Sequence, residues 1–400
     1  MKFVHVEDFI HPDAGYQLNL LSKLQVEQGH EVTIITAEIE EVPIFLTSFF
    51  GKEDIDQKDE AFFKRTGVRI LRHPIYRFLS GRAIFKSGLH RLIKDQKPDV
   101  LFVHGEDTLT GMKLLWDYKK MNVPYVLDCH MLEMASENRF REYFRVFFRK
   151  FVTPIILKNH IPLIRVVDSD FVEKHFNIPL NKTHLLSFGT DTNYYRPDAA
   201  IKLKYREEYK FDEEDFIVLY AGKLDSYKGG EFLSSALKQR IEAKGRNIKF
   251  IIIGTSPKDD YGREVEYNFS QSENDILRMP TQTYAGLAKY YQMADIAIFP
   301  KQCSMSYYEV QSCGLPVILE ENEINVERAS NFKGIIFKEQ SQESLRDAII
   351  EFAEMDKFDF DSFKKNAREN VVQNYDYVHI AQKFTNVMID EHKRFYNSQI

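Results

Sequence analysis

The sequence predicts an α/β protein that contains two parallel β-sheets, each with helices on both of its faces. Short apolar runs of strand length recur along the chain, and stretches of helical length separate them. No two of these runs are joined by a hairpin signal, so neighbouring strands are expected to be parallel and connected through helices. The same alternation occurs in both halves of the 400 residues, which is enough chain for two domains with separate cores.

The first half begins with a strand, a helix and a second strand, which together form one βαβ unit. The helix spans Tyr16–Gln28, carries Leu18, Leu21 and Leu24 on one face, and ends at Gly29. The strands expected in this half are Met1–Val6, Glu31–Ala37, Val68–Leu71, Val100–His104, Tyr125–Cys129, Leu163–Val167 and His184–Phe188.

The second half repeats this organisation, and its most informative segment is Asp295–Ile318. There a strand leads through a small polar loop into the helix Tyr307–Cys313, which ends at Gly314, and Pro316 starts the next strand. Such a loop leaves backbone N–H groups and the positive helix end at the edge of the sheet, where phosphate binds well. The other elements expected here are the strands Phe216–Ala221, Lys249–Ile253, Asp275–Arg278, Asp295–Phe299, Pro316–Leu319 and Gly334–Phe337 and the helices Asp361–Tyr375 and Ile380–Tyr396.

The composition argues against several classes of protein. Three widely spaced cysteines, Cys129, Cys303 and Cys313, form neither a disulfide framework nor a zinc pattern, and they favour a reducing compartment. The amino-terminal segment lacks the apolar core of a signal peptide, and no apolar run is long enough to span a bilayer, so a cytoplasmic protein is expected. No Gly-x-Gly-x-x-Gly pattern follows the first strand of either half, which disfavours a dinucleotide oxidoreductase.

Charge is distributed unevenly along the chain. The net charge is −6, of which Met1–Arg196 contributes +1 and the remainder −7. Within the first half, Lys64–Lys97 holds ten Lys or Arg residues against the single acid Asp95. A basic patch of this kind indicates an anionic partner.

The segment Arg139–Phe151 combines arginines with aromatic residues at helical spacing, among them Phe140, Phe144 and Phe147. Two interpretations remain open. The aromatic stripe packs into the first domain with the arginines in water, or the helix lies in a membrane interface. The basic segment Lys64–Lys97 favours an anionic membrane if it faces the same side. Nucleic acid is not expected, because the overall charge is negative and no recognition module is present.

The segment Glu309–Val317 resembles a motif of the retaining glycosyltransferases of family 4, whose fold is called GT-B. In that family a helix opens with Glu in the pattern E-A-x-A-x-G-x-P-V, and EVQSCGLPV has the same spacing. The resemblance implies that Glu309 accepts hydrogen bonds from the ribose hydroxyls of a sugar nucleotide. Ser306 and Glu309 also fit a helix capping box, and the two interpretations are compatible in one fold.

The run Tyr220–Leu224, followed by Lys228-Gly229-Gly230, resembles the family segment G-R-L…K-G. The resemblance implies that Gly222 borders the donor and that Lys223 and Lys228 clamp its diphosphate as a leaving group. Lys223 stands where the family more often has Arg, which keeps the charge but loses the fork geometry. Two ordinary surface lysines are the alternative. Arg278 falls where the family backbone meets the nucleotide base.

The chain also departs from the family pattern. The family has a second, earlier Glu in the form E-x7-E, and this position is Lys301 here. The polar residues left to meet the donor sugar are Gln302, Ser304 and Ser306. This departure motivates an alternative function, a non-catalytic GT-B partner subunit that binds another protein.

In the first half the resemblance implicates Gly15 and His130. Gly15, at the mouth of the first helix, gives a ligand close backbone approach, although the family has Gly-Gly where this chain has Ala14-Gly15; a simple turn is the alternative. His130 follows a strand, and the family histidine there contacts the donor sugar or the reacting centre. A capping or solvent-facing histidine is the alternative, and His104, at the end of the preceding strand, is a rival.

Over nearly the whole chain, the resemblance implies two Rossmann-like domains that face each other across a cleft. Residues 1–196 would bind the acceptor, residues 197–379 would bind a UDP- or GDP-sugar, and a helix within 380–400 would pack back on the first domain. The implied reaction transfers the sugar to an acceptor hydroxyl with retention and without a metal or other cofactor. A glycan or lipid-linked acceptor at a membrane face, as in polysaccharide or glycolipid assembly, is the expected substrate.

Overall fold

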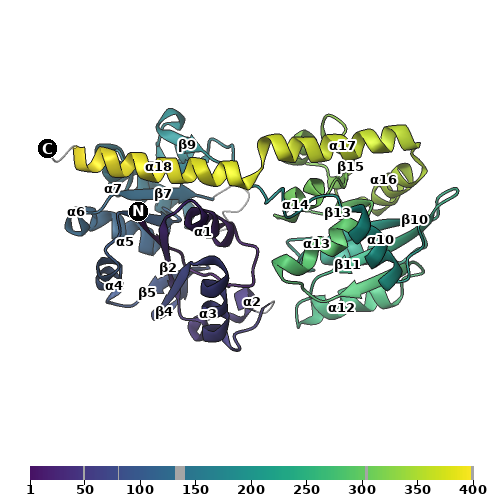
Figure 1. The fold of residues 1–400 in the computed structure, drawn as a ribbon, viewed down its shortest axis with the longest axis horizontal. Coiled ribbons are helices and arrows are strands. Elements are labelled where there is room, and N and C mark those ends of the chain that lie inside the picture. The colour runs from purple at the N-terminus through teal and green to yellow at the C-terminus, as the bar shows by residue number, and fades with distance from the viewer. Residues whose placement is uncertain (48–49, 80, 131–139, 302–304, 398–400) are drawn as a thin grey trace. The chain divides into compact units, whose positions relative to one another are not determined.

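The structure is a computed structural model of the 400 residues, and it describes residues 1–47, 50–79, 81–130, 140–301 and 305–397. Its contacts divide the chain into two compact units. Unit 1 comprises Met1–Phe188 and Tyr377–Ile400, and unit 2 comprises Gly189–Asp376. Each unit is built around one large parallel sheet with helices on both faces, as the sequence pattern predicts (Figure 1).

The segment between the two units differs from the predicted boundary after Arg196. Residues 189–196 pack with unit 2, because Tyr195 is fully buried there. The Tyr195 ring meets the Tyr284 ring edge-on, with 5.0 Å between the ring centroids, and its hydroxyl donates to the Tyr284 carbonyl oxygen at 2.7 Å. At the other crossing, the helix that returns to unit 1 begins at Tyr377 rather than at residue 380.

The sheet of unit 1 has the strand order β3-β2-β1-β6-β7-β8-β9, and every neighbouring pair is parallel. The order reverses between β1 and β6, which are the first strands of its two halves. The strands are β1 (Lys2–Val6), β2 (Glu31–Ala37), β3 (Arg69–His73), β6 (Val100–His104), β7 (Tyr125–Cys129), β8 (Leu163–Arg165) and β9 (Thr183–Leu185).

Helices cover both faces of this sheet. Successive side chains of a strand point to opposite faces, and both faces of a parallel sheet are buried under helices. The helices of unit 1 are α1 (Gln17–Glu27), α2 (Ile44–Thr47), α3 (Ile55–Thr66), α4 (Leu89–Asp95), α5 (Leu109–Trp116), α6 (Tyr118–Met121), α7 (Arg141–Phe151), α8 (Thr153–Lys158), α9 (Phe171–Phe176) and α18 (Tyr377–Asn397), with 3-10 turns at Ile39–Glu41 and Leu180–Lys182. One core lies between α1, α18 and side chains that include Phe3 and Phe102. The other core lies between α5, α7, α9 and the alternate side chains, which include Val4 and Leu101.

Unit 1 also contains a hairpin that the sequence analysis did not expect. Strands β4 (Ile75–Leu79) and β5 (Arg82–Phe85) pair in antiparallel fashion beside the main sheet. Gly81 has a φ of 76°, which suits a tight turn that other residues disfavour. Ile75, Ala83 and Phe85 are buried while the intervening residues are more exposed, so a two-residue alternation was present but short.

The sheet of unit 2 has the order β12-β11-β10-β13-β14-β15 and is also entirely parallel. Its order reverses between β10 and β13. The strands are β10 (Asp215–Ala221), β11 (Asn247–Ile253), β12 (Asp275–Met279), β13 (Ile296–Phe299), β14 (Val317–Glu320) and β15 (Gly334–Phe337).

The helices of unit 2 again lie on both faces of the sheet. They are α10 (Ala199–Glu208), α11 (Gly230–Ala236), α12 (Asp260–Ser270), α13 (Tyr284–Met293), α14 (Ser306–Ser312), α15 (Glu323–Ala329), α16 (Gln342–Glu354) and α17 (Lys357–Asn374). Helices α11, α12 and α16 share a core with Phe216 and Val218. Helix α13 packs on β10 and on α10, and α14 packs on α17.

Candidate functional site

In unit 2 the carboxyl ends of β10 and β13 meet where the strand order reverses, which is where open α/β sheets bind their ligands. Gly222 and Lys223 follow β10, and Pro300 and Lys301 follow β13. A hydrogen bond joins the two loops, because Lys301 Nζ donates to the carbonyl oxygen of Ser226 at 3.1 Å. The lysine that replaces the family's earlier Glu therefore ties the β13 loop to the β10 loop.

Three glycines allow the backbone of this region to pack closely. A Cβ on Gly230, the first residue of α11, would lie 2.5 Å from the Leu224 carbonyl oxygen. A Cβ on Gly254, after β11, would lie 1.8 Å from the Gly222 carbonyl oxygen, and Gly254 has a φ of 143°. Gly229 has a φ of 74° and faces Pro300. The backbones of the loops after β10, β11 and β13 thus pack closely against one another.

The two predicted lysines both lie on the β10 loop. Lys223 follows the strand, and Lys228 precedes Gly229 at the start of α11. The Lys228 N–H donates to Asp225 Oδ1 at 3.0 Å, which closes the turn. Partial burial lowers the pKa of the Lys223 amine, and the Asp225 carboxylate opposes that shift. The loop therefore brings two cations to the end of the sheet, as a diphosphate site requires.

Glu309 lies on α14, a helix whose residues are all buried. Its side chain is 4% exposed, and Oε2 accepts a hydrogen bond from the hydroxyl of Tyr291 at 2.8 Å. Burial raises the pKa of Glu309 from 4.5 to about 7, although the Tyr291 hydroxyl opposes that shift. The carboxyl group is therefore held rigidly and changes charge near neutral pH.

Helix α14 does not begin with the capping box that Ser306 and Glu309 would allow. Met305 occupies the N-cap position, and Ser306 is the first helical residue. The Ser306 hydroxyl donates to the Ala221 carbonyl oxygen at 3.2 Å, which anchors the helix to the end of β10. Two other predicted sugar contacts, Gln302 and Ser304, lie outside the described residues.

The side chain of Arg278 is engaged in holding the structure together. Its Nη1 donates to the Ile252 carbonyl oxygen at 2.7 Å, and Nη2 donates to the Gly254 carbonyl oxygen at 3.1 Å. The guanidinium also pairs with Glu266 at 2.7 Å and lies over the ring of Phe269. The guanidinium of Arg278 is therefore occupied by contacts within unit 2.

The sequence analysis missed the residues that fix α14 from behind. Arg368 of α17 donates to Ser312 Oγ at 2.8 Å, to the Tyr195 carbonyl oxygen at 2.9 Å and to the Thr192 carbonyl oxygen at 3.0 Å. The buried rings of Tyr195 and Tyr291 contact each other beside Glu309. These contacts join residues far apart in the sequence, so no local pattern indicated them.

In unit 1 a chain of polar side chains begins at the carboxyl ends of β6 and β7. His104 Nδ1 lies 2.6 Å from Asp128 Oδ2, and His130 Nε2 lies 3.0 Å from the same oxygen. The other Asp128 oxygen accepts a hydrogen bond from the Gly105 N–H at 2.8 Å. Asp128 thus joins His130 to its rival His104, a link that sequence analysis missed although an Asp inside an apolar strand is an available signal.

The chain continues from His104 into the core of unit 1. His104 Nε2 lies 3.0 Å from His5 Nδ1, and His5 Nε2 lies 2.8 Å from Gln25 Oε1. The Gln25 amide nitrogen lies 3.2 Å from the sulfur of Met388 on α18. Burial and then His104 lower the pKa of His5 to about 3, so His5 is neutral. Its Nε2–H donates to Gln25, and its Nδ1 accepts from His104.

Asp128 and His130 alter each other's pKa. Burial acts to raise the pKa of Asp128, but His104 and His130 outweigh it and hold that pKa far below its usual range. Burial acts to lower the pKa of His130, but Asp128 outweighs it and raises that pKa above 6.5. The His130 side chain is 34% exposed, so its imidazole is accessible at the end of the sheet.

Acidic side chains follow the neighbouring strands as well. Glu7 and Asp8 come after β1, and Glu106 and Asp107 come after β6. Burial and then Glu7 raise the pKa of Asp8 to about 8, and burial raises the pKa of Glu106 well above 4.5. Arg82 lies 3.9 Å from Asp8 and 3.8 Å from Asp107 and offsets part of the charge. Such clustered carboxyl groups suit the recognition of hydroxyl groups.

His104, Asp128 and His130 are the one group of described residues whose ligand atoms could hold a metal ion. These atoms lie within 4.8 Å of one another. In the observed arrangement they satisfy each other through hydrogen bonds.

Gly15, which was predicted to border a ligand, lies just before α1. It is not among the glycines with positive φ, so its backbone conformation does not require glycine.

Helix α7 combines features of both interpretations of the aromatic segment. Phe148 is fully buried and stacks on Phe176, with 4.0 Å between the ring centroids. Arg145 is only 4% exposed, because it pairs with Glu142 at 2.7 Å and lies over the ring of Phe171. The expectation that the arginines lie in water is therefore wrong for Arg145, and Arg139 lies outside the described residues. The exposed apolar side chains of the segment are Phe140, Tyr143, Val146 and Phe151.

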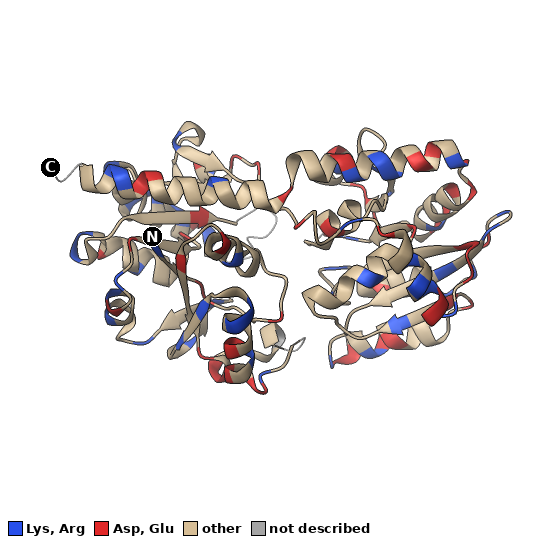
Figure 2. Cartoon of the chain, in the orientation of Figure 1, with Lys and Arg blue, Asp and Glu red and all other residues tan. Residues whose placement is uncertain are grey.

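The basic segment Lys64–Lys97 is spread over several elements rather than gathered in one patch. It covers the end of α3, strand β3, the β4–β5 hairpin and α4, and acidic residues lie between its cations (Figure 2). Arg72 pairs with Asp59, and Lys86 pairs with Glu41. Its exposed cations lie on several of these elements and include Arg65, Arg69 and Arg77, while Arg91 of α4 pairs with Asp95. None of the described helices is both long and apolar enough to cross a bilayer.

Sequence comparisons identify both halves of the chain. Residues 201–370 match the family described as "Glycosyl transferases group 1". Residues 14–154 match the "Glycosyl transferase 4-like domain". A D-inositol 3-phosphate glycosyltransferase of Segniliparus rotundus is 24% identical over 160 residues, which are 38% of this chain and 34% of that protein. The putative glycosyltransferase YtcC of Bacillus subtilis is 22% identical over 242 residues, 53% of this chain and 56% of that protein.

Solved structures resemble the chain over nearly its whole length. A glycosyltransferase from Rickettsia africae has a TM-score of 0.72 at 16% identity and covers 98% of both chains. Anabaena Alr3699/HepE in complex with UDP-glucose has a TM-score of 0.71 at 15% identity and covers 98% of this chain and 100% of its own. These similarities confirm the predicted GT-B fold, while the curated inositol-phosphate relative is matched over only about a third of its length.

Replacing Asp128 by Asn should lower the pKa of the His130 imidazole. The carboxylate that stabilises the imidazolium is then lost, and burial, which disfavours the charge, remains. Titration of His130 by NMR in both proteins measures the change. Asp168→Asn, which neutralises a carboxyl group that is 83% exposed, is the control. An unchanged His130 titration in Asp128→Asn would show that the pair has no electrostatic effect.

Replacing Glu309 by Gln should stabilise the protein at pH 8 and not at pH 4. Because the folded-state pKa of Glu309, about 7, exceeds its ordinary 4.5, the wild type loses stability as the pH rises between these values. The accumulated difference is on the order of 3 kcal/mol above pH 7. Urea unfolding of both proteins across this pH range measures it. A constant difference between the two proteins at every pH would contradict the assigned pKa.

Proposed function

We propose that this chain, which belongs to the group 1 glycosyltransferases with a glycosyltransferase 4-like amino-terminal domain, transfers a sugar from a nucleoside-diphosphate sugar to an acceptor hydroxyl with retention at the anomeric carbon. Unit 2 binds the donor, and unit 1 binds the acceptor. The observation that carries the proposal is the arrangement at the ends of β10 and β13. There Lys223, Lys228 and the rigidly held Glu309 stand beside backbone that only glycine allows to approach so closely.

The proposed roles follow from the chemistry of each side chain. Lys223 and Lys228 neutralise the diphosphate and stabilise it as it leaves, so the transfer needs no metal ion. Glu309, when ionised, accepts hydrogen bonds from two ribose hydroxyls, since a carboxylate oxygen has lone pairs beyond the one that Tyr291 uses. The Anabaena structure of the same fold holds UDP-glucose, which supports a uridine nucleotide as the first donor to test.

Unit 1 supplies groups suited to the acceptor and the reacting centre. His130, whose protonated form Asp128 favours, stabilises negative charge that develops during the transfer. The carboxyl groups of Glu7, Asp8 and Asp107 accept hydrogen bonds from acceptor hydroxyls. A polyhydroxylated acceptor, such as a glycan or the sugar head of a lipid, fits this lining.

A peripheral position on an anionic membrane follows from the outer helices of unit 1. Trp116, at the end of α5, is exposed and contacts Phe147 of α7 with 6.0 Å between the ring centroids. Lys94 of α4 donates to the carbonyl oxygen of Lys120 at 3.1 Å, which places α4 beside α6, the helix that follows α5. The exposed aromatic residues of α7 and the lysines of α4 and α6 therefore belong to adjacent elements, the arrangement of an interfacial membrane surface (Figure 1). A cytoplasmic face is proposed, because neither of the described cysteines forms a disulfide.

The second candidate function is a non-catalytic partner subunit. Lys301 favours it, because this residue replaces an acid of the family motif and its ammonium group donates a hydrogen bond to the Ser226 carbonyl oxygen. Such a subunit would have no requirement for donor binding. Nucleotide binding therefore separates the two functions.

Calorimetric titration with UDP, GDP and their common sugars should reveal one preferred nucleotide. Lys228→Met should weaken its binding about 10- to 100-fold, because a charge-assisted contact to phosphate is lost. Glu309→Ala should weaken nucleoside diphosphates but spare inorganic diphosphate, since it removes only the ribose contact. Wild-type binding should also weaken below pH 7 as Glu309 takes up a proton.

The matched control for Lys228 is Lys258→Met, which removes an exposed lysine of the same unit. Transfer is then measured with the preferred donor and a range of glycan acceptors, with and without EDTA. Retention is read from the anomeric configuration of the product. If no nucleotide binds the wild type, the partner-subunit function replaces the enzyme.

Sedimentation with vesicles tests the membrane surface. Wild type should bind vesicles that contain anionic phosphatidylglycerol and should not bind pure phosphatidylcholine. Binding should fall about tenfold or more in the double variant Trp116→Ser and Tyr143→Ser. Tyr267→Ser, which changes an exposed tyrosine of unit 2, is the control. Arg145 is unsuitable for charge reversal because it is buried. Equal binding by the double variant would remove these helices from the membrane contact.

A further inference from the structure

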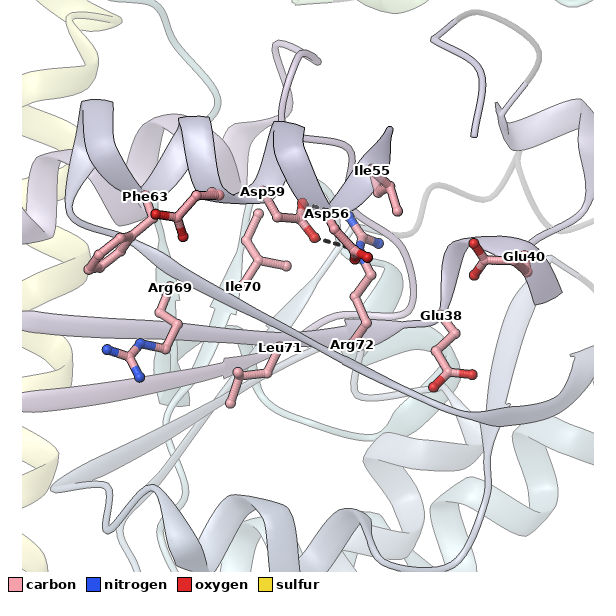
Figure 3. A pocket seen from close by; sticks show the side chains of 11 residues that line it. Glu38, Glu40, Ile55, Asp56, Asp59, Phe63, Arg69, Ile70, Leu71 and Arg72 are labelled. Atoms are coloured by element: carbon pink, nitrogen blue, oxygen red, sulfur yellow. Dashed lines mark hydrogen bonds and ion pairs between the residues drawn. The ribbon is translucent and has the colours of Figure 1, made fainter. Parts of the chain in front are cut away.

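A groove of about 740 Å³ runs along the outer edge of the unit 1 sheet. Four consecutive residues of β3, Arg69 to Arg72, line it. Figure 3 shows that Ile70 and Arg72 project toward α3, whereas Arg69 and Leu71 project to the other side of the strand. A cavity that touches both faces of one strand lies along the edge of that strand and not over one face of the sheet.

The outer edge of β3 carries backbone groups that lack a partner strand. Among the described residues, β3 is the last strand of its sheet and pairs only with β2. The Glu38 N–H donates to the His73 carbonyl oxygen at 3.1 Å, so His73 faces β2. Because successive residues point their backbone groups to opposite sides, Ile70 and Arg72 present their N–H and C=O groups to the groove. No hydrogen bond from the described part of the chain reaches these groups.

The next residue of the same parity supports this assignment. Pro74 directs its carbonyl oxygen away from β2 and accepts a hydrogen bond from the Lys86 N–H at 2.9 Å. The hairpin β4–β5 thus uses the outward groups beyond His73 and leaves those of β3 open. Open strand edges are the places where an extended peptide adds a strand.

The lining of the groove is acidic. Its carboxyl groups belong to Glu38, Glu40, Asp56, Asp59 and Glu60, and its cations are Arg69 and Arg72. Arg72 is held by Asp59 through two contacts of 2.6 and 2.9 Å and by the Ala37 carbonyl oxygen. Within the described residues, the carboxylates of Glu38, Glu40 and Asp56 have no ion-pair partner. Ile55, Phe63, Ile70 and Leu71 supply apolar surface between them.

We propose that the groove along β3 binds an extended, lysine- or arginine-rich peptide segment of a partner protein, which adds a strand to the unit 1 sheet. The backbone of Ile70 and Arg72 pairs with the peptide, and Glu38, Glu40 and Asp56 receive its cations. A second copy of this chain fits less well, because two copies of an edge with excess carboxylates would repel each other. The inference does not depend on the proposed transferase activity.

The probe is the peptide acetyl-Gly-Lys-Val-Lys-Val-Lys-Gly-amide, titrated into the full chain by calorimetry. It should bind with one-to-one stoichiometry, and the same peptide with Glu in place of Lys should not bind. A copy of the lysine peptide with alternate backbone nitrogens methylated keeps every charge but cannot form a strand. Its affinity should be at least about tenfold weaker.

Two variants of the chain test the two contributions separately. Ile70→Pro removes one outward N–H and leaves the pairing with β2, so it should weaken the lysine peptide about tenfold or more. The triple variant Glu38→Gln, Glu40→Gln and Asp56→Asn should also weaken it, whereas Glu207→Gln, Glu264→Gln and Glu351→Gln, which change exposed acids elsewhere, should not. Circular dichroism verifies that each variant is folded.

Hydrogen exchange gives a readout at single residues. The amides of Ile70 and Arg72 should become protected when the lysine peptide binds, while that of Leu71, already paired with β2, should not change. Equal binding of the methylated peptide, or binding without protection of these amides, would overturn strand addition. A wild-type dimer that Ile70→Pro dissociates would assign the edge to a second copy instead and would likewise overturn the proposal.

Discussion

Both large sheets obey one constraint, which is that all of their strands run in the same direction. The carboxyl ends of all strands then lie on the same side of the sheet, and the residue that follows each strand lies there too. Most strand interiors are apolar on both faces, with His5 of β1 among the exceptions, so most polar side chains lie where the strands end. Lys223 and Lys301 lie at the carboxyl ends of the unit 2 strands in this way, and His104, Asp128 and His130 lie at those of the unit 1 strands. The topology alone thus gathers the candidate site residues at the carboxyl ends of the strands in each unit.

Helix α14 shows that a carboxyl group placed in such a buried region is desolvated. Its first turn carries a carboxyl group and the whole helix is buried, so Glu309 is desolvated and holds its proton more tightly than a surface acid. Tyr291 and Arg368 keep the helix in place by bonding the carboxyl group and the helix end. Rigidity of this kind suits a binding group, because little conformational freedom remains to be lost when a ligand arrives. The same burial makes the group sensitive to pH.

Most strands of both sheets could be predicted because each is a short apolar run that ends at a polar residue or Pro. Glu31–Ala37, Val100–His104, Tyr125–Cys129 and Gly334–Phe337 agree with the structure in both ends. The β4–β5 hairpin escaped because its alternation is short and its turn is marked mainly by Gly81. Lys223, Lys228, Glu309 and His130 could be singled out because the segments around them resemble motifs of the family. His5, Tyr291 and Arg368 could not, because their partners are distant in sequence and only the folded chain brings them together. Asp128 offered a signal as an Asp inside an apolar strand, but its link to His104 joins two different strands.

The return of α18 to unit 1 has a consequence for how the protein forms. Unit 2 is one continuous stretch of chain, whereas unit 1 needs residues from both sides of it. Phe384 and Met388 of α18 pack beside Phe3 and Val126, and Met388 contacts Gln25 at the inner end of the histidine chain. During synthesis, unit 2 can therefore fold on the ribosome while one face of the unit 1 sheet is not yet covered by α18. The strands of unit 1 are synthesised first, yet unit 1 is completed last. Until α18 packs on them, their apolar side chains are exposed and prone to aggregation.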